Sequence, residues 1–327
     1  MSDKSKIEWC DASWNPVTGC TKVSEGCRNC YASTFSERFR GTPGHYFENG
    51  FDLTLRPDKL DQPYSWKRPR KIFVNSMSDL FHKDIPDDFI WSVFHIMAKC
   101  PQHTFQVLTK RPERMMQMLK NRYWRNLDPI HALIIEGEHR ETDSPFLPNV
   151  WLGTSVENQQ VADERIPHLL GTPAAVRFLS MEPLLGPVNL NGFFYTADLL
   201  TVVSTAERRG ISNNDAFDYV VDNYPDDVHK REDRPSWIIV GGESGSKARP
   251  MHPEWARSIR DQCKAAGLPF FFKQYGEWAP FNSLDYMPKQ STIAVRMGIE
   301  TIWRVGKHKA GRLLDGVEHN EFPGVHS

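Results

Sequence analysis

The feature that most constrains the fold is a series of short apolar runs that alternate with helix-like segments. The runs are KIFVNSMSDLF from Lys71, TFQVLTKRP from Thr104, NVWLGTSVEN from Asn149, VRFLSMEPLLG from Val176, WIIVGGESG from Trp237 and PFFFKQYGEW from Pro269. A further run, WNPVT from Trp14, is expected to be the first strand. Continuous apolar runs of this kind are typical of parallel strands that are buried on both faces.

Four segments between these runs have helical character. They are residues 87–101, 111–122, 157–170 and 252–267. The first carries Phe89, Ile90, Val93, Phe94 and Met97 at helical spacing, and the last ends at Gly267. Because strand-then-helix units repeat along the chain, right-handed crossovers and an α/β barrel or open sheet are expected.

Two interruptions set the expected domain organisation. Residues 137–149 look like a surface loop, and residues 187–235 form a long insertion between two predicted strands. We therefore expect a barrel domain over residues 1–280 with the insertion at 187–235. Residues 281–327 are expected to form a C-terminal extension that packs on the barrel.

Three of the six cysteines fall in one short stretch, GCTKVSEGCRNCYA, at residues 19–32. The first residues lack the apolar stretch of a signal peptide, and no run of about 18 apolar residues is present. A cytoplasmic protein without a membrane partner is therefore expected. In a reducing compartment, clustered cysteines more often bind metal or do chemistry than form disulfides.

The number of clustered thiols suggests an incompletely ligated metal centre. A structural zinc site closes with four ligands, and a simple iron–sulfur carrier uses four cysteines. Cys20, Cys27 and Cys30 instead fit a four-iron, four-sulfur cluster with one iron free. Their C-x6-C-x2-C spacing shares its tight pair with the C-x3-C-x2-C pattern of radical S-adenosylmethionine (SAM) enzymes. Spacing alone leaves open zinc with His45 as the fourth ligand, and a purely structural thiol cluster.

Polar residues follow most of the predicted strands. Because ligands gather at the carboxyl ends of strands in parallel α/β barrels, we expect these residues to face one bowl beneath the cysteines. They are Ser76, Ser78, Asp79, Lys110, Arg111, Thr154, Ser155, Glu157, Glu182, Gly241, Gly242 and Glu243. Each taken singly also suits a helix N-cap or a turn.

Seven ordered motifs carry a resemblance to a known family. The motifs are WNPVTGCTKVSEGCRNCYA, VNSMSDLFH, LTKRP, GTSVEN, SMEPLLG, GGESG and FFFKQYG. Together they resemble a phage- and bacteria-borne three-cysteine-motif family, often catalogued as being of unknown function and grouped with the radical SAM enzymes. The similarity spans nearly the whole chain except residues 187–235. It implies a radical SAM-type partial (β/α) TIM-like barrel with parallel strands and an inserted segment.

The resemblance also implies two cofactors. A [4Fe-4S] cluster would be held by Cys20, Cys27 and Cys30, and SAM would chelate its free iron. In the enzymes that the chain resembles, one-electron reduction cleaves SAM to a 5′-deoxyadenosyl radical, which takes a hydrogen atom from the substrate.

The same resemblance assigns the SAM contacts. Ser76 and Asp79 would hold the methionyl amino group, and Ser155 and Glu157 the ribose or carboxylate. Met181 and Glu182 would flank the adenine. The aromatic residue that usually precedes the last cysteine is missing here, because Arg28 and Asn29 fill that gap. Tyr31, directly after Cys30, is expected to contact the adenine instead.

Branches of this family look like enzymes of phage DNA hypermodification. There a radical isomerase converts thymidine with an N-linked glycyl group on its 5-methyl carbon into the C-linked isomer. The resemblance implies modified DNA as the substrate and a host or phage one-electron reductant as partner, in the host cytoplasm. Lys110 and Arg111 would then hold a phosphate or the glycyl carboxylate, and Glu243 the amine, as the catalytic candidates. The 187–235 insertion is expected to supply a groove for the duplex.

Two other functions remain open at this point. One is another radical SAM reaction on nucleic acid, such as base repair, and the other is a non-catalytic zinc module that binds nucleic acid or a protein. The formal net charge of −1 argues against coating nucleic acid through bulk charge. The basic stretches at 66–71 and 109–125 could still line a local groove.

Overall fold

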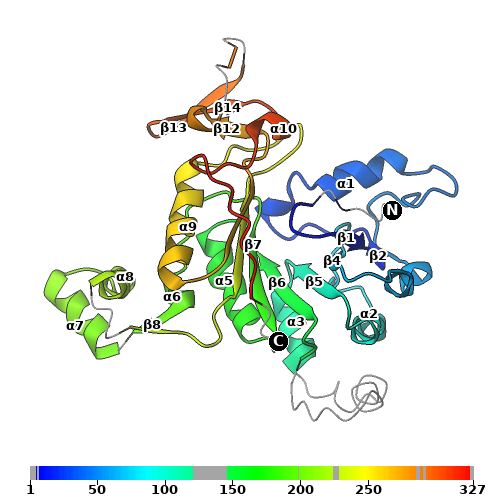
Figure 1. Cartoon of the computed structure of the whole chain (residues 1–327), viewed down its shortest axis with the longest axis horizontal. Helices are drawn as coiled ribbons and strands as arrows, with labels where there is room; N and C mark the ends of the chain where they lie inside the picture. Colours follow the sequence, from blue (N-terminus) through cyan, green and yellow to red (C-terminus); the bar gives the residue numbers. More distant parts are fainter. Residues whose placement is uncertain are drawn as a thin grey trace.

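The centre of the molecule is a seven-stranded parallel sheet that curls into a half-barrel (Figure 1). The computed structural model describes residues 5, 7–120, 146–197, 199–223, 228–284, 288–289 and 292–324. In order across the sheet, the strands are β1 (Ala12–Trp14), β4 (Lys71–Val74), β5 (Thr104–Thr109), β6 (Val150–Ser155), β7 (Val176–Met181), β10 (Trp237–Gly241) and β11 (Phe270–Gln274). The predicted α/β class and the six predicted strands from Lys71 onward are confirmed.

Helices complete the crossovers between neighbouring strands. They are α2 (Asp87–Lys99), α3 (Pro112–Lys120), α5 (Gln159–Leu170) and α9 (Pro253–Ala266). All four lie within the segments predicted to be helical, and α9 ends at Gly267, whose φ is 66°. The surface loop predicted at 137–149 lies largely outside the described residues. Within the described part of the chain, no helix is long and apolar enough to span a membrane.

The first strand differs from its prediction. The predicted run begins at Trp14, whereas β1 ends there and pairs with β4 in parallel. Pro16 lies two residues further on, and since a proline has no N–H to donate, it marks the point where the chain leaves this edge strand. The next residues form β2 (Val17–Thr18), which pairs antiparallel with β3 (Thr54–Leu55) instead.

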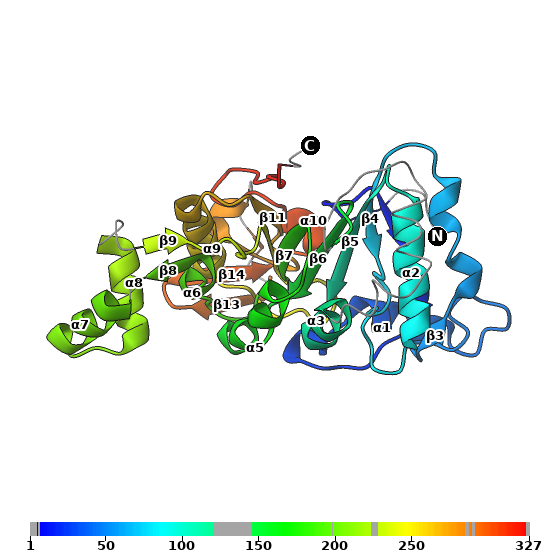
Figure 2. The ribbon, with the colours of Figure 1, turned by 90° about the horizontal axis from the view of Figure 1, so that it is seen from below.

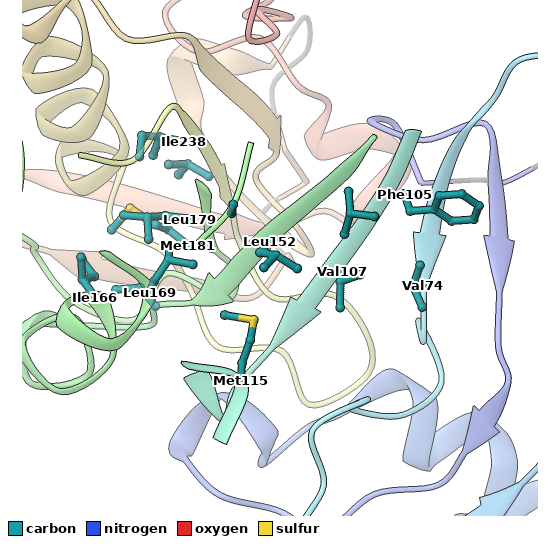
Figure 3. Close-up of a cluster of buried hydrophobic side chains, with 14 of the residues drawn as sticks. Val74, Phe105, Val107, Met115, Leu152, Ile166, Leu169, Leu179, Met181 and Ile238 are labelled. Carbon is teal, nitrogen blue, oxygen red and sulfur yellow. The ribbon is translucent and has the colours of Figure 1, made fainter. Parts of the chain in front are cut away.

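The convex face of the sheet carries the main hydrophobic core. Alternate strand residues such as Val107 and Leu152 pack against Met115 of α3 and Leu169 of α5 (Figure 3). These side chains are fully or almost fully buried. Burial of strand and helix faces against one another fixes the half-barrel and hence the direction of the strand ends.

The concave face is closed at its base by residues from both ends of the chain. Trp9 packs on Phe73 with ring centroids 4.7 Å apart, and Phe322 lies 4.9 Å from Trp237. Gly153 leaves room for this cluster, because a Cβ there would meet the Phe178 ring at 2.5 Å. Aromatic side chains therefore cover this part of the concave face, which further strands would enclose in a closed barrel.

Two further parts flank the half-barrel. The insertion contains α6 (Asn191–Phe194), β8 (Tyr195–Ala197), α7 (Leu199–Arg209), α8 (Asn213–Asn223) and β9 (Val228–Lys230). The α7–α8 pair has its own small apolar core and projects from one end of the molecule (Figure 2). After the barrel come β12 (Trp278–Pro280), β13 (Ala294–Met297) and β14 (Glu300–Arg304), which form an antiparallel sheet, and α10 (Lys307–Ala310). The chain then returns beside β11, where Asn320 bridges Phe271.

Candidate functional site

A cavity of about 800 Å³ lies at the concave side of the half-barrel, over the carboxyl ends of the strands. All three clustered cysteines line it, as does Tyr31. The strand-end residues that line it are Ser76, Ser78, Asp79, Lys110, Arg111, Ser155, Glu182, Gly242 and Glu243. The bowl expected from the strand ends therefore exists. Among the described residues, Thr154, Glu157 and Gly241 lie behind this lining, and none of those from the 187–235 insertion reaches it.

The cysteine loop, residues 20–30, connects β2 to α1 (Tyr31–Ser36) across this cavity. Cys20 opens the loop, Cys27 ends a short 3-10 turn, and Cys30 caps the start of α1. All three are free and partly exposed. Gly19 just before the loop has a φ of 81°, and a Cβ there would lie 2.1 Å from the carbonyl oxygen of Asp52. Only glycine therefore allows the loop to turn this closely over the backbone.

All three thiols line this one cavity. In the described part of the chain, no three His, Cys, Asp or Glu side chains are grouped to hold a single metal ion. His45, considered as a fourth zinc ligand, is not among the cavity residues. Its ring stacks on Phe39 at 4.0 Å, and its Nδ1 accepts a hydrogen bond from the backbone N–H of Phe47. This arrangement gives the zinc and His45 alternative no support.

The first anchor of the cysteine loop is Asp79, at the end of β4. The Asp79 carboxylate accepts hydrogen bonds from the Thr109 hydroxyl at 2.6 Å and from Arg111 Nη1 at 2.8 Å. Arg111 Nη1 also lies 3.4 Å from Cys20 Sγ, and its Nη2 donates to the Thr21 carbonyl at 3.0 Å. Arg111 therefore ties the first cysteine to the β4–β5 edge of the cavity.

The surroundings of Cys20 disfavour its thiolate form. Burial, and next the negative charge of Asp79, raise the pKa of the Cys20 thiol to about 11, although Arg111 acts in the opposite sense. The thiol is therefore protonated at neutral pH in the metal-free chain. A metal centre that binds here must displace that proton.

The second anchor is Glu157, directly after β6. Its side chain is fully buried, and Oε1 accepts hydrogen bonds from Lys110 Nζ at 2.7 Å and Ser24 Oγ at 2.8 Å. Arg165 Nη1 lies 3.2 Å from Oε2. A Cβ at Gly26 would lie 2.1 Å from Oε1, so the loop backbone rests directly on this carboxylate.

The third anchor is Glu243, after β10. Arg249 holds its two oxygens at 2.7 and 2.9 Å, and Asn29 Nδ2 donates to Oε2 at 3.0 Å. Arg249 also donates to the Glu25 carbonyl at 2.9 Å. Although burial acts to raise the pKa of the Glu243 carboxyl, the bonds from Arg249 and Asn29 outweigh it and lower the pKa.

Three strand-end carboxylates thus hold one loop from three sides. Asp79 acts through Arg111 on Cys20, Glu157 supports Ser24 and Gly26, and Glu243 holds Asn29. Each carboxylate is largely buried and charge-paired, so its bonds are strong and geometrically defined. The loop's three thiols are therefore presented to the cavity by a network anchored in the rigid sheet.

Glu157→Gln is expected to lower the free energy of unfolding by about 3–5 kcal/mol, the usual cost of removing one partner from a buried pair. Lys110 and Arg165 would lose their counter-charge, while an amide keeps the volume. Burial acts to raise the pKa of Glu157, but Lys110 and Arg165 outweigh it and lower the pKa below its ordinary 4.5. The stabilisation that the ionised Glu157 contributes is therefore complete above pH 4.5, the ordinary pKa of the group. It is lost as the pH falls through the lowered pKa of the folded protein.

Urea unfolding of wild type and Glu157→Gln from neutral to acid pH measures both effects. The variant should lose part of the acid dependence. Glu37→Gln is a matched control, since Glu37 forms an exposed pair with Arg40, and it should leave the urea midpoint unchanged. Equal midpoints for wild type and Glu157→Gln at neutral pH would contradict the anchoring role.

The SAM contacts implied by the resemblance are only partly free for a ligand. The Tyr31 hydroxyl donates to the Ser76 carbonyl oxygen at 2.6 Å, while its side chain remains exposed. Asp79 and Glu157 are fully engaged within the protein, and Glu157 does not line the cavity. Glu182 lines it and pairs with Lys273 at 2.8 Å.

The catalytic candidates are likewise engaged. Lys110, Arg111 and Glu243 line the cavity, but their charges are bound to Glu157, Asp79 and Arg249. The residues that complete these pairs were not predicted: Ser24, Asn29, Arg165, Arg249 and Lys273. Only Lys273 carries a usable signal in the sequence, because it stands at the carboxyl end of a predicted strand.

Comparison with known proteins gives one finding. The model of the family described as "Protein of unknown function (DUF5131)" matches residues 4–323, nearly the whole chain. No curated protein and no solved structure matches.

Proposed function

The chain belongs to this family of proteins of unknown function, and from its own site we propose that it is a radical SAM enzyme. The observation that carries the proposal is the cysteine loop. It brings three free thiols to a large cavity at the carboxyl ends of a parallel half-barrel, the position where such folds bind ligands.

The donor set, three thiols on one short loop, fits a [4Fe-4S] cluster. Such a cluster has its irons at separate corners, so its thiolate ligands stand apart instead of meeting at one point. The thiols of Cys20, Cys27 and Cys30 share a cavity without forming a single-ion group among the described residues. Three thiolates also leave one iron open, where SAM would bind.

The protein's own residues would position and shield this chemistry. When bound and reduced, the cluster and SAM would supply a radical that takes a hydrogen atom from the substrate. The three anchors hold the cysteine loop in place, and Arg111 offers a hydrogen bond to the Cys20 sulfur. The apolar base of the cavity, which includes Trp9, Phe73 and Leu108, keeps water from the reacting groups.

We further propose an amino-acid-modified thymidine in phage DNA as the substrate, with rearrangement from the N-linked to the C-linked glycyl isomer. This substrate is supported by the seven motifs that resemble those of the three-cysteine-motif family. The chemistry also supports it. The C–H bond of the glycyl α-carbon is weak, because the amine and the carboxylate both stabilise the carbon radical that is left when the hydrogen atom is removed. A cavity of about 800 Å³ falls within the range of small-molecule sites and has room for a flipped nucleoside.

Mass spectrometry of nucleosides tests the proposed reaction. DNA that carries the N-linked glycyl precursor is incubated anaerobically with reconstituted enzyme, SAM and a reductant, then digested. We expect a new nucleoside of unchanged mass and altered retention. If 5′-deoxyadenosine forms while the precursor survives, the substrate is wrong, and damaged bases become the next substrates to test. If no 5′-deoxyadenosine forms and the chain binds one zinc, the enzyme class itself is wrong.

A further inference from the structure

One ion pair in the cavity takes no part in holding the cysteine loop. Lys273 Nζ lies 2.8 Å from Glu182 Oε2, and both residues line the cavity. Their side chains are 13% and 19% exposed, so the pair is largely removed from water yet open to a ligand. By contrast, Asp79, Glu157 and Glu243 are committed to partners that hold the loop.

The sheet explains why this pair faces the cavity. Lys273 stands on β11 where the pairing of this strand with β10 shifts register, between Phe272 and Gln274, and its side chain lines the cavity. Ser180 of β7 lines the cavity, and Glu182 follows it two residues later. The pair therefore bridges the ends of β7 and β11, away from the β4–β5 edge where Arg111 holds Cys20.

A third group completes the arrangement. Gln274 is 4% exposed and lines the cavity. Its Nε2 donates to Ser244 Oγ at 3.1 Å and faces Glu182 Oε1 at 3.4 Å, which fixes the orientation of the amide. The other amide atom, Oε1, has no hydrogen-bond partner within the described chain. Gln274 therefore acts on this pair through its Nε2, which lies beside the Glu182 carboxylate.

We infer that Glu182 and Lys273, with Gln274 positioning Glu182, form a subsite for a zwitterionic α-amino acid group. The ligand's ammonium bonds Glu182, and its carboxylate bonds Lys273. A ligand with both charges keeps all four charges paired, whereas a ligand with one charge leaves a protein charge without its partner. A largely buried ion pair adds little net stability over an apolar pair, so this one is explained better by binding than by folding.

Two molecules of the proposed reaction carry such a group, namely SAM and the glycyl-modified nucleoside. The choice of these two molecules as probes rests on the proposed function, whereas the subsite itself is argued from the ion pair and its position in the cavity. Calorimetric binding to the full-length protein uses two matched pairs. One is thymidine with an N-linked glycyl group against 5-aminomethyl-2′-deoxyuridine, which lacks the carboxylate. The other is S-adenosylhomocysteine against 5′-methylthioadenosine, which lacks the amino acid end.

Wild type should prefer the zwitterion in at least one pair by about 10–100-fold, the usual strength of a charged hydrogen bond. Lys273→Met should abolish that preference, and Lys273→Arg should retain most of it. The pair that loses its preference identifies the source of the zwitterion. Lys264→Met, an equivalent change on the exposed side of α9, should leave both preferences intact.

Two results would overturn the subsite: no preference in wild type, or preferences that Lys273→Met leaves unchanged. Because the readout is binding, it separates this inference from the proposed reaction. If Lys273→Met abolishes the preference while wild type produces no isomer from modified DNA, the subsite stands and the isomerase fails. If the isomer forms while Lys273→Met keeps every preference, the reaction stands and the subsite fails.

Discussion

Cys27→Ser protein, reconstituted anaerobically with iron and sulfide, is expected to stay folded but to hold no complete cluster and to release no 5′-deoxyadenosine from SAM. Cys27 is partly exposed at the end of a short 3-10 turn, and its nearest side-chain partner is Ser24 Oγ at 3.9 Å. The substitution therefore removes little packing. It does remove one of only three thiolates available in the cavity, so the loss should be nearly complete.

The control for this experiment is another cysteine of the same chain. Cys263 is fully buried on α9 and does not line the cavity. Cys263→Ala should bind iron and sulfide as wild type does and cleave SAM at the wild-type rate. Iron and sulfide content, the absorbance of the cluster and 5′-deoxyadenosine release are measured together. A Cys27→Ser protein with full cluster content and full cleavage would refute the three-thiol centre.

The strands of the half-barrel could be predicted from the sequence because each is buried on both faces. Runs such as the one from Trp237 have no polar alternation, so their position in the chain is unambiguous. The first strand was harder to place, because Pro16 separates a short sheet strand, β1, from a second pairing of Val17 and Thr18 with β3. The end of the first strand is therefore marked by Pro16 and not by a change in hydrophobicity.

The residues that line the cavity were also predictable, but the ion pairs and hydrogen bonds that they form were not. The carboxyl ends of parallel strands meet at one edge, so most residues read from those ends do line the cavity. Their partners lie far away in the chain. Arg111 and Cys20 are 91 residues apart, Ser24 and Glu157 are 133 apart, and Asn29 and Glu243 are 214 apart. No periodicity in a single sequence encodes such pairs.

Lys273 shows what the strand-end rule can still yield. It stands at the end of β11, just as Lys110 stands after β5, and it lines the cavity in the same way. The sequence therefore contains its position, whereas its pairing with Glu182 depends on the order of strands in the sheet. The order of the strands determines which strand-end residues meet, and a single sequence does not give that order.

Arg111→Met is expected to leave all three thiols in place and yet to weaken the centre that they hold. Arg111 places one N–H group 3.4 Å from Cys20 Sγ and carries the positive charge nearest to that sulfur. Hydrogen bonds and charges at ligating sulfurs set the stability and reduction potential of iron–sulfur clusters. We expect the variant to assemble a cluster, to lose it to a chelator roughly 10–100-fold faster, and to show a more negative midpoint potential.

Two further variants separate charge from geometry. Arg111→Lys keeps the positive charge but loses the planar group that reaches Asp79, Thr21 and the sulfur together, so it should restore the potential only partly. Arg114→Met, on α3, is the matched control, because Arg114 pairs with Asp87 and not with the cysteine loop. It should keep the wild-type potential and chelator rate. If Arg111→Met matched wild type in both measurements, the guanidinium would have no influence on the Cys20 sulfur, and its role would be confined to its ion pair with Asp79.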